Sequence, residues 1–540
     1  MKLLGPISIL GGLILLFAYL VSISAFCYWL TATKITTAHR FVSGGEVLFW
    51  FAVFGILSVM WGRLRGILNL TTLHALYSDR LVRTYLGASN PSRWEAEGAG
   101  VTKPDKDDDM PFVDYKPYEN GGPLHIINTT FNETMSGESQ LDQRDRKGLP
   151  LAVSPIAMSA GVSHHAQINT SNDIDKARYS HKVPLKPIEI KGQEQESVSK
   201  TDGNKKVGSF KIFPKDTKIK AEALTLGEWV GISGAAVSTG MGSHTNVGLS
   251  IVLAFFNIRL GYWWDSGIAP RKRETRTHYA VPSEILLGLV KAFRFVFRTQ
   301  SYLLDEAFGR FHGPARRLWN LSDGGHFENT GVYELIRREL PLILCLDNGA
   351  DPKYEFADLG NLVRRARTDF GAEIEFVTIK KVKEKTNGAQ QEKKEKKVKY
   401  VVKKTPDWLK EEYKDLLQTI VEEGNGFFGS VEHLKREDTK HNPDVPLSKC
   451  HASLAAARYK KSGKQGILIL LKPTLTGDEP QDVQQYYVAH KDFPDETTAD
   501  QFFDEAQWES YRKLGHHIGE QLMDCLPKLQ ASNDSRSVDT

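Results

Sequence analysis

The chain has 540 residues, which is long enough for more than one domain. Charged residues make up 25% of it and the formal net charge is +4, so the composition is that of an ordinary globular protein and implies no nucleic-acid partner. The four cysteines are widely spaced and show no metal-ligand spacing. This pattern argues against a disulfide framework and favours a reducing compartment, and we expect no metal or other cofactor.

The first expected element is an apolar helix at the N-terminus. No charged residue occurs between Lys2 and Lys34, and residues 3–30 are almost entirely apolar. A bilayer span takes about 20 apolar residues, so this run is long enough even when tilted. A cleaved signal peptide is the alternative, but the apolar run is longer than that of a signal sequence and residues 22–25 form a poor cleavage site.

A second apolar run, residues 47–62, lies between Glu46 and Arg63. It is short for a span, so a buried or re-entrant helix stays open as an alternative. Lys34 and Arg40 lie between the two apolar runs, whereas four arginines follow the second run, at positions 63, 65, 80 and 83. This bias favours a transmembrane helical hairpin over residues 1–64, anchored in the inner or plasma membrane, with a cytoplasmic main body.

Structured and polar stretches alternate beyond the hairpin. Residues 124–130 are expected to form a strand, and the polar residues 167–208 an exposed excursion. Residues 247–260 form a strongly apolar stretch that predicts a helix. The aromatic cluster Tyr262-Trp263-Trp264 follows it and suits either the core or a lipid-facing lip.

The last third of the chain begins with a basic stretch. Residues 380–404 carry eleven lysines against three glutamates, which suggests a β-hairpin or a flexible insertion. Such a run is usually solvated, although a weak contact with an anionic membrane stays open. Residues 467–473 predict a strand, residues 495–509 suit an amphipathic docking helix, and residues 531–540 are expected to be disordered.

The most informative stretch is residues 321–329, where a short apolar run leads into Asp323-Gly324-Gly325 and a helix-like segment follows. Two glycines after an acid let the backbone turn sharply at the end of a strand, so that the carboxylate can point into a cleft. A carboxylate fixed in that place suits a catalytic base or an orienting group. An ordinary turn also explains these three residues when they are taken alone.

Together with the apolar strand expected at residues 342–346, which ends in DNGADP, this stretch resembles the patatin-like phospholipases. More closely, it is similar to a bacterial, membrane-linked branch related to cytosolic phospholipase A2. Three further segments resemble the same family in the same order: NLTTLHALYSDRL at 69–81, ISGAAVS at 232–238 and FPDETTADQFFDE at 493–505. The resemblance implies an α/β fold with three layers of sheet and helix. This chain need not contain all of that fold.

The resemblance also implies a serine–aspartate dyad. In that family a serine on a tight strand-to-helix elbow attacks an ester, the Asp-Gly-Gly aspartate assists it, and a glycine-rich loop stabilises the oxyanion. Asp323 would then be the dyad acid, Gly324 and Gly325 would hold its turn, and His326 would support the pocket. The chain contains neither a Gly-Gly-Gly-x-Arg loop nor a Gly-x-Ser-x-Gly elbow. It is therefore expected to be similar to the C-terminal half of such an enzyme.

The nearest substitute for the elbow is Gly231-Ile232-Ser233-Gly234-Ala235. Small residues around a serine allow a tight turn, so Ser233 is a candidate nucleophile. However, residues 224–230 are not a clean buried strand, and the family places this segment downstream of its nucleophile. The alternative is that Ser233 and Gly234 pack or line the pocket, while the nucleophile comes from a missing segment or a partner chain.

Two functions follow from these expectations. The first is a membrane-anchored serine acyl hydrolase, or its acid-bearing half, that acts on a phospholipid or other acyl ester of the membrane. The second is a catalytically inactive, membrane-anchored scaffold. Half of the fold would leave a sheet edge unpaired, which favours a partner chain. The expected domains are the hairpin at 1–64, a patatin-like domain at 65–379, the Lys-rich insertion at 380–404, a C-terminal α/β extension of the same domain at 405–530, and the tail at 531–540.

Overall fold

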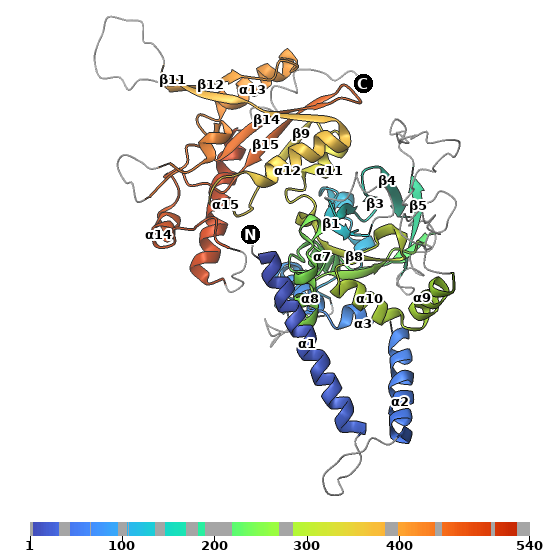
Figure 1. The fold of residues 1–540 in the computed structure, drawn as a ribbon. Helices are drawn as coiled ribbons and strands as arrows, with labels where there is room; N and C mark the ends of the chain where they lie inside the picture. Colours follow the sequence, from blue (N-terminus) through green and yellow to red (C-terminus); the bar gives the residue numbers. More distant parts are fainter. Residues whose placement is uncertain are drawn as a thin grey trace, which may run out of the picture. The chain divides into compact units, whose positions relative to one another are not determined.

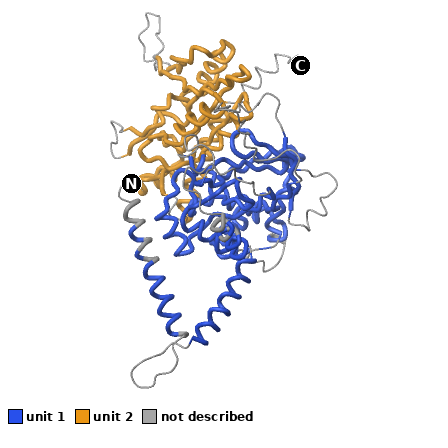
Figure 2. The backbone as a smooth tube through the Cα atoms, turned by 45° about the vertical axis from the view of Figure 1, so that its right-hand side comes forward, with its two compact units in different colours: residues 1–327 blue, residues 328–540 orange. Residues whose placement is uncertain are grey.

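The computed structural model describes residues 4–31, 44–64, 66–95, 105, 107–135, 146–168, 182–188, 219–268, 284–383, 398–437, 445–497 and 503–525. The chain is mixed α/β and divides into two compact units, residues 1–327 and residues 328–540 (Figure 2). The boundary falls inside the range 65–379 that was expected to form one domain, directly after the Asp-Gly-Gly turn. The tail expected at 531–540 lies outside the described residues.

Unit 1 is built on an eight-stranded antiparallel sheet with the order β6-β5-β4-β3-β2-β1-β8-β7 (Figure 1). The first six strands form a meander, and β8 and β7 are added on the free side of β1. The strands are β1 Ile127–Asn132, β2 Gly148–Val153, β3 Ala157–Ala160, β4 His164–Ile168, β5 Lys182–Ile188, β6 Ile219–Glu222, β7 Tyr262–Asp265 and β8 Leu318–Asp323. The strand expected at 124–130 is thus found as β1, inside the sheet.

One expectation for this region is wrong in the part that the structure describes. The stretch 167–208 was expected to be an exposed excursion, but its residues 182–188 form β5, which pairs with β4 and β6. Residues 169–181 and 189–208 lie outside the described residues. Val183 and Leu185 of β5 are buried in the core. Because a strand with one buried face needs an apolar residue only at every second position, two such residues within a polar run are enough to form it.

The two faces of the sheet in unit 1 differ in character. On one face, Phe131, Trp319 and Trp264 are fully buried and pack against Trp229 and Ile232 of helix α7, Leu226–Ser233. The expected aromatic cluster therefore belongs to the core. The opposite face of β1 and β8 carries Asn132, Asn320 and Ser322, which are equally buried. Buried polar groups of this kind need hydrogen-bond partners. Asn132 finds two of them in the loop after α7, the carbonyl of Gly240 and the backbone N–H of Gly242.

The other helices of unit 1 are α1 Leu4–Thr31, α2 Gly44–Arg63, α3 Ile67–Leu70, α4 His74–Leu81, α5 Ser92–Glu95, α8 Val247–Phe255, α9 Glu284–Val296 and α10 Arg298–Ala307.

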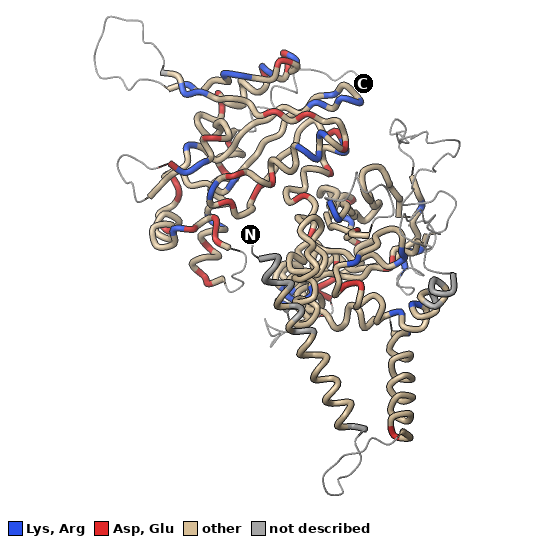
Figure 3. The backbone as a smooth tube through the Cα atoms, in the orientation of Figure 1, with Lys and Arg blue, Asp and Glu red and all other residues tan. Residues whose placement is uncertain are grey.

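Helices α1 and α2 extend from the same side of the unit (Figure 1), and charged residues are nearly absent along both (Figure 3). Within the described residues, α2 is the one helix long and apolar enough to cross a membrane, and Phe17–Trp29 of α1 is a shorter apolar stretch. Helix α8 is shorter than the expected 247–260, because Asn257 has a positive φ of 55°.

Buried polar contacts hold the segment 69–81 against the sheet. Asn69 Oδ1 accepts from the backbone N–H of Trp263 at 2.8 Å and its Nδ2 donates to the carbonyl of Trp263 at 3.1 Å, so this side chain satisfies part of the edge of β7. Arg259 donates to Thr71 Oγ1 at 2.9 Å and to Glu306 Oε2 at 2.8 Å. Arg259 and Glu306 are both buried, and a buried charge is tolerated when it is paired in this way.

Helix α4 crosses α7 at a row of glycines. A Cβ atom on Gly231 would lie 3.0 Å from Ser78 Cβ, and one on Gly227 would overlap Val82 and lie 2.7 Å from Asp109 Oδ2. Ser78 Oγ donates to the carbonyl of Gly227 at 2.9 Å. The missing side chains therefore let the two helix backbones approach closely and fix the position of the C-terminal end of α7.

Unit 2 contains a five-stranded sheet in which β10-β14-β15-β9 are neighbours and β13 pairs with β14, together with the hairpin β11–β12. Its strands are β9 Leu342–Leu346, β10 Ala372–Phe376, β11 Thr378–Lys383, β12 Val398–Lys404, β13 Phe428–Gly429, β14 Ala452–Tyr459 and β15 Gln465–Leu471. Its helices are α11 Val332–Arg337, α12 Ala357–Arg365, α13 Glu411–Glu423, α14 Gln481–Ala489 and α15 Glu505–Cys525. The two ends of the expected Lys-rich insertion pair as a β-hairpin, and its centre lies outside the described residues.

The core of unit 2 lies between the sheet and α13, α14 and α15. These helices bury Ile469 and Leu471 of β15, but the neighbouring strand β9 exposes Leu342, Leu344 and Leu346 on the same face of the sheet. Among the described residues β9 pairs only with β15, so it is an edge strand with an apolar, accessible face. Such an edge is a site where another strand can add.

The crossing of α4 and α7 gives a prediction about stability. Substitution Gly227→Ala should destabilise unit 1 by roughly 1–3 kcal/mol, because the added methyl group meets Val82 and Asp109. The measurement is denaturant unfolding of the detergent-solubilised chain. Gly519→Ala in α15 is the matched control, since nothing lies within 4 Å of its Cβ position. Equal stability of the two variants would show that the crossing tolerates a side chain.

Candidate functional site

Asp323 is the last residue of β8, and the structure builds the expected turn around it. Thr129 of β1 is its partner in the sheet register. The carboxylate caps the short 3-10 turn Gly324–His326, with Oδ1 accepting from the backbone N–H of Gly325 at 2.6 Å. A Cβ atom on Gly324 would lie 2.5 Å from the carbonyl oxygen of Asn128, so only glycine fits there. The turn thus requires glycine at position 324, whereas Gly325 contributes its backbone N–H.

The environment of Asp323 changes its acidity. Burial raises the pKa of its carboxyl group to about 6, and the hydrogen bond from Gly325 opposes this rise. Desolvation disfavours the charged form, and no cation of the described residues is among the causes that offset it. A carboxyl group with a pKa close to neutrality can exchange a proton with a substrate or a nucleophile near physiological pH.

Tyr77 of α4 also lies at this site, and sequence reasoning did not single it out. Burial raises the pKa of its hydroxyl, and the charge of Asp323 raises it further. A Cβ atom on Gly234 would lie 2.6 Å from the Tyr77 hydroxyl oxygen, so Gly234 leaves the space that this hydroxyl occupies. The only signal in the sequence was the position of Tyr77 inside the family-like segment 69–81.

Ser233 is close to the same residues but makes a different contact. It is the last residue of α7, and its Oγ donates to the carbonyl oxygen of Asn128 at 2.8 Å. This is the carbonyl that Gly324 approaches. Among the described residues no hydrogen bond joins Ser233 to Asp323, and the serine ends a helix, whereas a nucleophile elbow joins a strand to a helix. Its role as nucleophile stays a prediction that requires the hydroxyl to turn away from Asn128.

His326 supports the site from the opposite side of β8. Its Nε2 lies 3.1 Å from the carbonyl oxygen of Ala236, so Nε2 carries the proton and donates. Its Nδ1 then accepts from Ser322 Oγ at 2.9 Å. Burial lowers the pKa of His326 to about 4, which keeps the ring neutral at physiological pH. The ring therefore ties the loop after α7 to the Asp-Gly-Gly turn.

Asn132 continues this polar network along β1. Its Nδ2 donates to Asn320 Oδ1 at 2.9 Å and to Ser322 Oγ at 3.1 Å, and its Oδ1 accepts from the backbone N–H of Gly242 at 2.9 Å. Because Ser322 accepts from Asn132, its own proton is free for His326. The expected site residues 233, 234 and 323–326 are thus brought together around the paired ends of β1 and β8.

The raised pKa of Asp323 gives a pH-dependent prediction. Its folded-state value of about 6 lies above the ordinary 3.8, so the folded chain binds this proton more tightly than the unfolded chain. Stability should fall as the pH rises from about 4 to about 6, by up to about 3 kcal/mol. Asp323→Asn should therefore be more stable than the unmodified chain at about pH 8 and should lose that advantage at about pH 4.

Denaturant unfolding of both proteins at the two pH values measures this difference. Asp358→Asn is the control, because Asp358 is a partner of Asn329 on the surface of unit 2. An advantage of Asp323→Asn that is the same at both pH values would contradict a buried, titrating carboxyl group.

Neither the protein-family models, nor the curated proteins, nor the solved structures contain a match to this chain.

Proposed function

We propose that this chain is a membrane-anchored acyl-ester hydrolase of the patatin-like kind, or its acid-bearing part, with Asp323 as the dyad acid. The observation that supports this most is the carboxyl group of Asp323 at the end of β8, buried and with a pKa raised to about 6. The turn that presents it requires Gly324 for its close approach to Asn128. A turn that only changes the direction of the chain would not require a buried carboxyl group.

The proposed chemistry is acyl transfer to a serine. The Asp323 carboxylate accepts the proton of the serine hydroxyl while Oγ attacks the ester carbonyl carbon. The proton then passes to the leaving alcohol, and water hydrolyses the acyl-serine in the second half of the reaction. At neutral pH most of the carboxyl group is ionised, and its poor solvation makes it a stronger base than an exposed aspartate.

Ser233 is the candidate nucleophile inside the chain, and a partner chain is the other source. Ser233 lies at the same end of β1 as Asp323, through its bond to Asn128. Tyr77 and Gly234 would then line the acyl site beside it. In this proposal a missing segment or the partner chain completes the patatin-like three-layer arrangement.

The proposed substrate follows from the two apolar helices. Helix α2 has 20 residues and exposes large apolar side chains such as Leu48 and Phe51. Gln300 of α10 donates to the carbonyl of Ser58 at 2.6 Å, which joins α2 to the body of unit 1. An anchored hairpin of α1 and α2 would keep the Asp323 site close to a bilayer, so the substrate would be a phospholipid or another membrane acyl ester, with the main body on the cytoplasmic side.

A second function, a catalytically inactive membrane-anchored scaffold, is favoured by one specific observation. The only proton of the Ser233 hydroxyl is donated to a backbone carbonyl, which is typical of a packed structural serine. In that case Asp323 has only a structural role in the turn, and the chain needs no nucleophile.

A fluorophosphonate probe distinguishes the two functions. We expect the detergent-purified chain to be labelled, with the labelling abolished by Ser233→Ala and reduced at least about 100-fold by Asp323→Asn, because loss of a general base costs 10²–10⁴-fold. Ser243→Ala is the matched control, a half-buried serine of the loop after α7. No labelling of the chain alone, nor with a co-purifying partner, would leave the scaffold as the function.

The edge strand β9 is the place where we propose that a partner chain adds. Substitution Leu344→Lys should reduce association at least tenfold, because a lysine on an edge strand opposes pairing with another strand. Multi-angle light scattering of the detergent-purified chain measures this. Val488→Lys on the exposed side of α14 is the control. A monomeric unmodified chain would remove this part of the proposal.

A further inference from the structure

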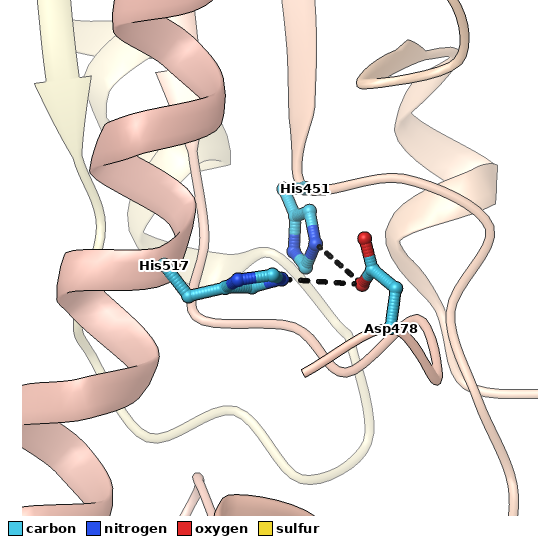
Figure 4. Close-up of side chains that lie close together, drawn as sticks. All are labelled: His451, Asp478 and His517. Carbon is cyan, nitrogen blue, oxygen red and sulfur yellow. Dashed lines mark ion pairs between the residues drawn. The ribbon is translucent and has the colours of Figure 1, made fainter. Parts of the chain in front are cut away.

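A group of potential metal ligands lies in unit 2, apart from the Asp323 site. His451, Asp478 and His517 come from three different places in the chain: the residue before β14, the loop after β15, and α15. Figure 4 shows both imidazole rings directed at the same carboxylate. His451 is 1% exposed, whereas the Asp478 side chain is 55% exposed, so the group opens to solvent on one side only.

Hydrogen bonds fix which nitrogen of each ring carries the proton. Thr474 Oγ1 donates its single proton to the carbonyl of Cys450 at 2.8 Å, so it must accept from His451 Nδ1 at 3.0 Å. The Nε2 atom of His451 therefore has a lone pair. Gln521 Nε2 donates to Asp478 Oδ2 at 2.8 Å and lies 2.8 Å from His517 Nε2. Because an amide nitrogen only donates, His517 Nε2 has a lone pair as well.

Three electron-rich atoms thus face one another. Asp478 Oδ1 lies 3.3 Å from His517 Nε2 and 3.8 Å from His451 Nε2. The single proton of the Thr476 hydroxyl can serve only one of its two close neighbours, Asp478 Oδ1 at 2.5 Å or His451 Nε2 at 3.1 Å. Lone pairs at these distances repel one another unless a cation lies between them. That cation is either a metal ion or an added proton on a histidine.

The geometry agrees with a metal ion. A tetrahedral zinc ion with bonds of about 2.0–2.1 Å places its ligands about 3.3–3.4 Å apart. The distance between Asp478 and His517 already has this value, and all three ligand atoms lie within 4.8 Å of one another. The distance of 3.8 Å between Asp478 and His451 is a few tenths of an ångström longer than this value. The two imidazole nitrogens lie within 4.8 Å of each other, so one or both rings must also move inward to bind the same ion.

We propose that His451 Nε2, His517 Nε2 and Asp478 Oδ1 bind a divalent zinc-type ion, with solvent in the fourth position. Two imidazoles and one carboxylate suit zinc better than magnesium or calcium, which prefer oxygen ligands. Thr474 orients the His451 ring from behind, as the outer partners of metal-bound histidines do. The ion joins α15 to the sheet, and this role is independent of the chemistry at Asp323.

Metal binding to the full-length, detergent-purified chain, produced without a histidine tag, tests this. After chelation and removal of the chelator, we expect one zinc ion per chain by isothermal titration calorimetry, and the visible bands of tetrahedral Co²⁺ on cobalt addition. His517→Ala and Asp478→Asn should each weaken zinc binding by at least about 100-fold. Thr474→Val, which keeps the shape but removes the acceptor of His451, should weaken it about 10–100-fold.

His516→Ala is the matched control, because His516 is the neighbour of His517 on α15 and pairs with Glu520 on the surface. It should bind zinc like the unmodified chain. Circular dichroism checks that each variant is folded. If His517→Ala is not folded, the exposed Asp478→Asn variant replaces it in the test. Zinc binding that is absent from the unmodified chain, or equal in His517→Ala and His516→Ala, would overturn the proposal and leave a protonated histidine as the cation.

Discussion

The pairing of β1 with β8 is the contact on which the Asp323 site depends. It places Thr129 opposite Asp323 and Phe131 opposite Leu321, and so joins the meander to the second half of unit 1. The alternation of side chains along both strands then gives two faces with opposite chemistry. Trp319, Leu321 and Asp323 share the apolar face under α7, whereas Asn320 and Ser322 belong to the polar face. A shift of one residue in this register would exchange the two sets.

The same register accounts for the opposite behaviour of two neighbouring ionisable groups. Asp323 is desolvated beneath α7 and resists losing its proton, so its pKa rises. His326 is desolvated on the other side of the turn and resists gaining a proton, so its pKa falls. Both groups are therefore driven toward their neutral forms by one cause, burial, with opposite effects on an acid and a base. The result is an acid that titrates near neutrality beside a histidine that stays neutral.

The local features of this site could be predicted from the sequence because they are encoded locally. An apolar run followed by Asp-Gly-Gly predicts a strand and a turn, and the structure has β8 and the turn at Gly324. The strand Leu342–Leu346 was predicted with the same limits. The Tyr77 contact could not be predicted, because it depends on how closely α4 crosses α7. The group of His451, Asp478 and His517 was missed for the same reason, since its members have no ligand spacing along the chain.

Long sequence separation also has a consequence for how the protein is made. Strands β1 to β6 pair with sequence neighbours, so the meander can form as it leaves the ribosome. The free side of β1, however, must wait for β8, since Thr130 and Gly324 are 194 residues apart. At about 5–20 residues per second this takes roughly 10–40 s of synthesis. The meander is complete once β6 ends at Glu222, and β8 begins only at Leu318. For about the last half of the interval, a six-stranded sheet therefore has an open strand edge at which a chaperone could act.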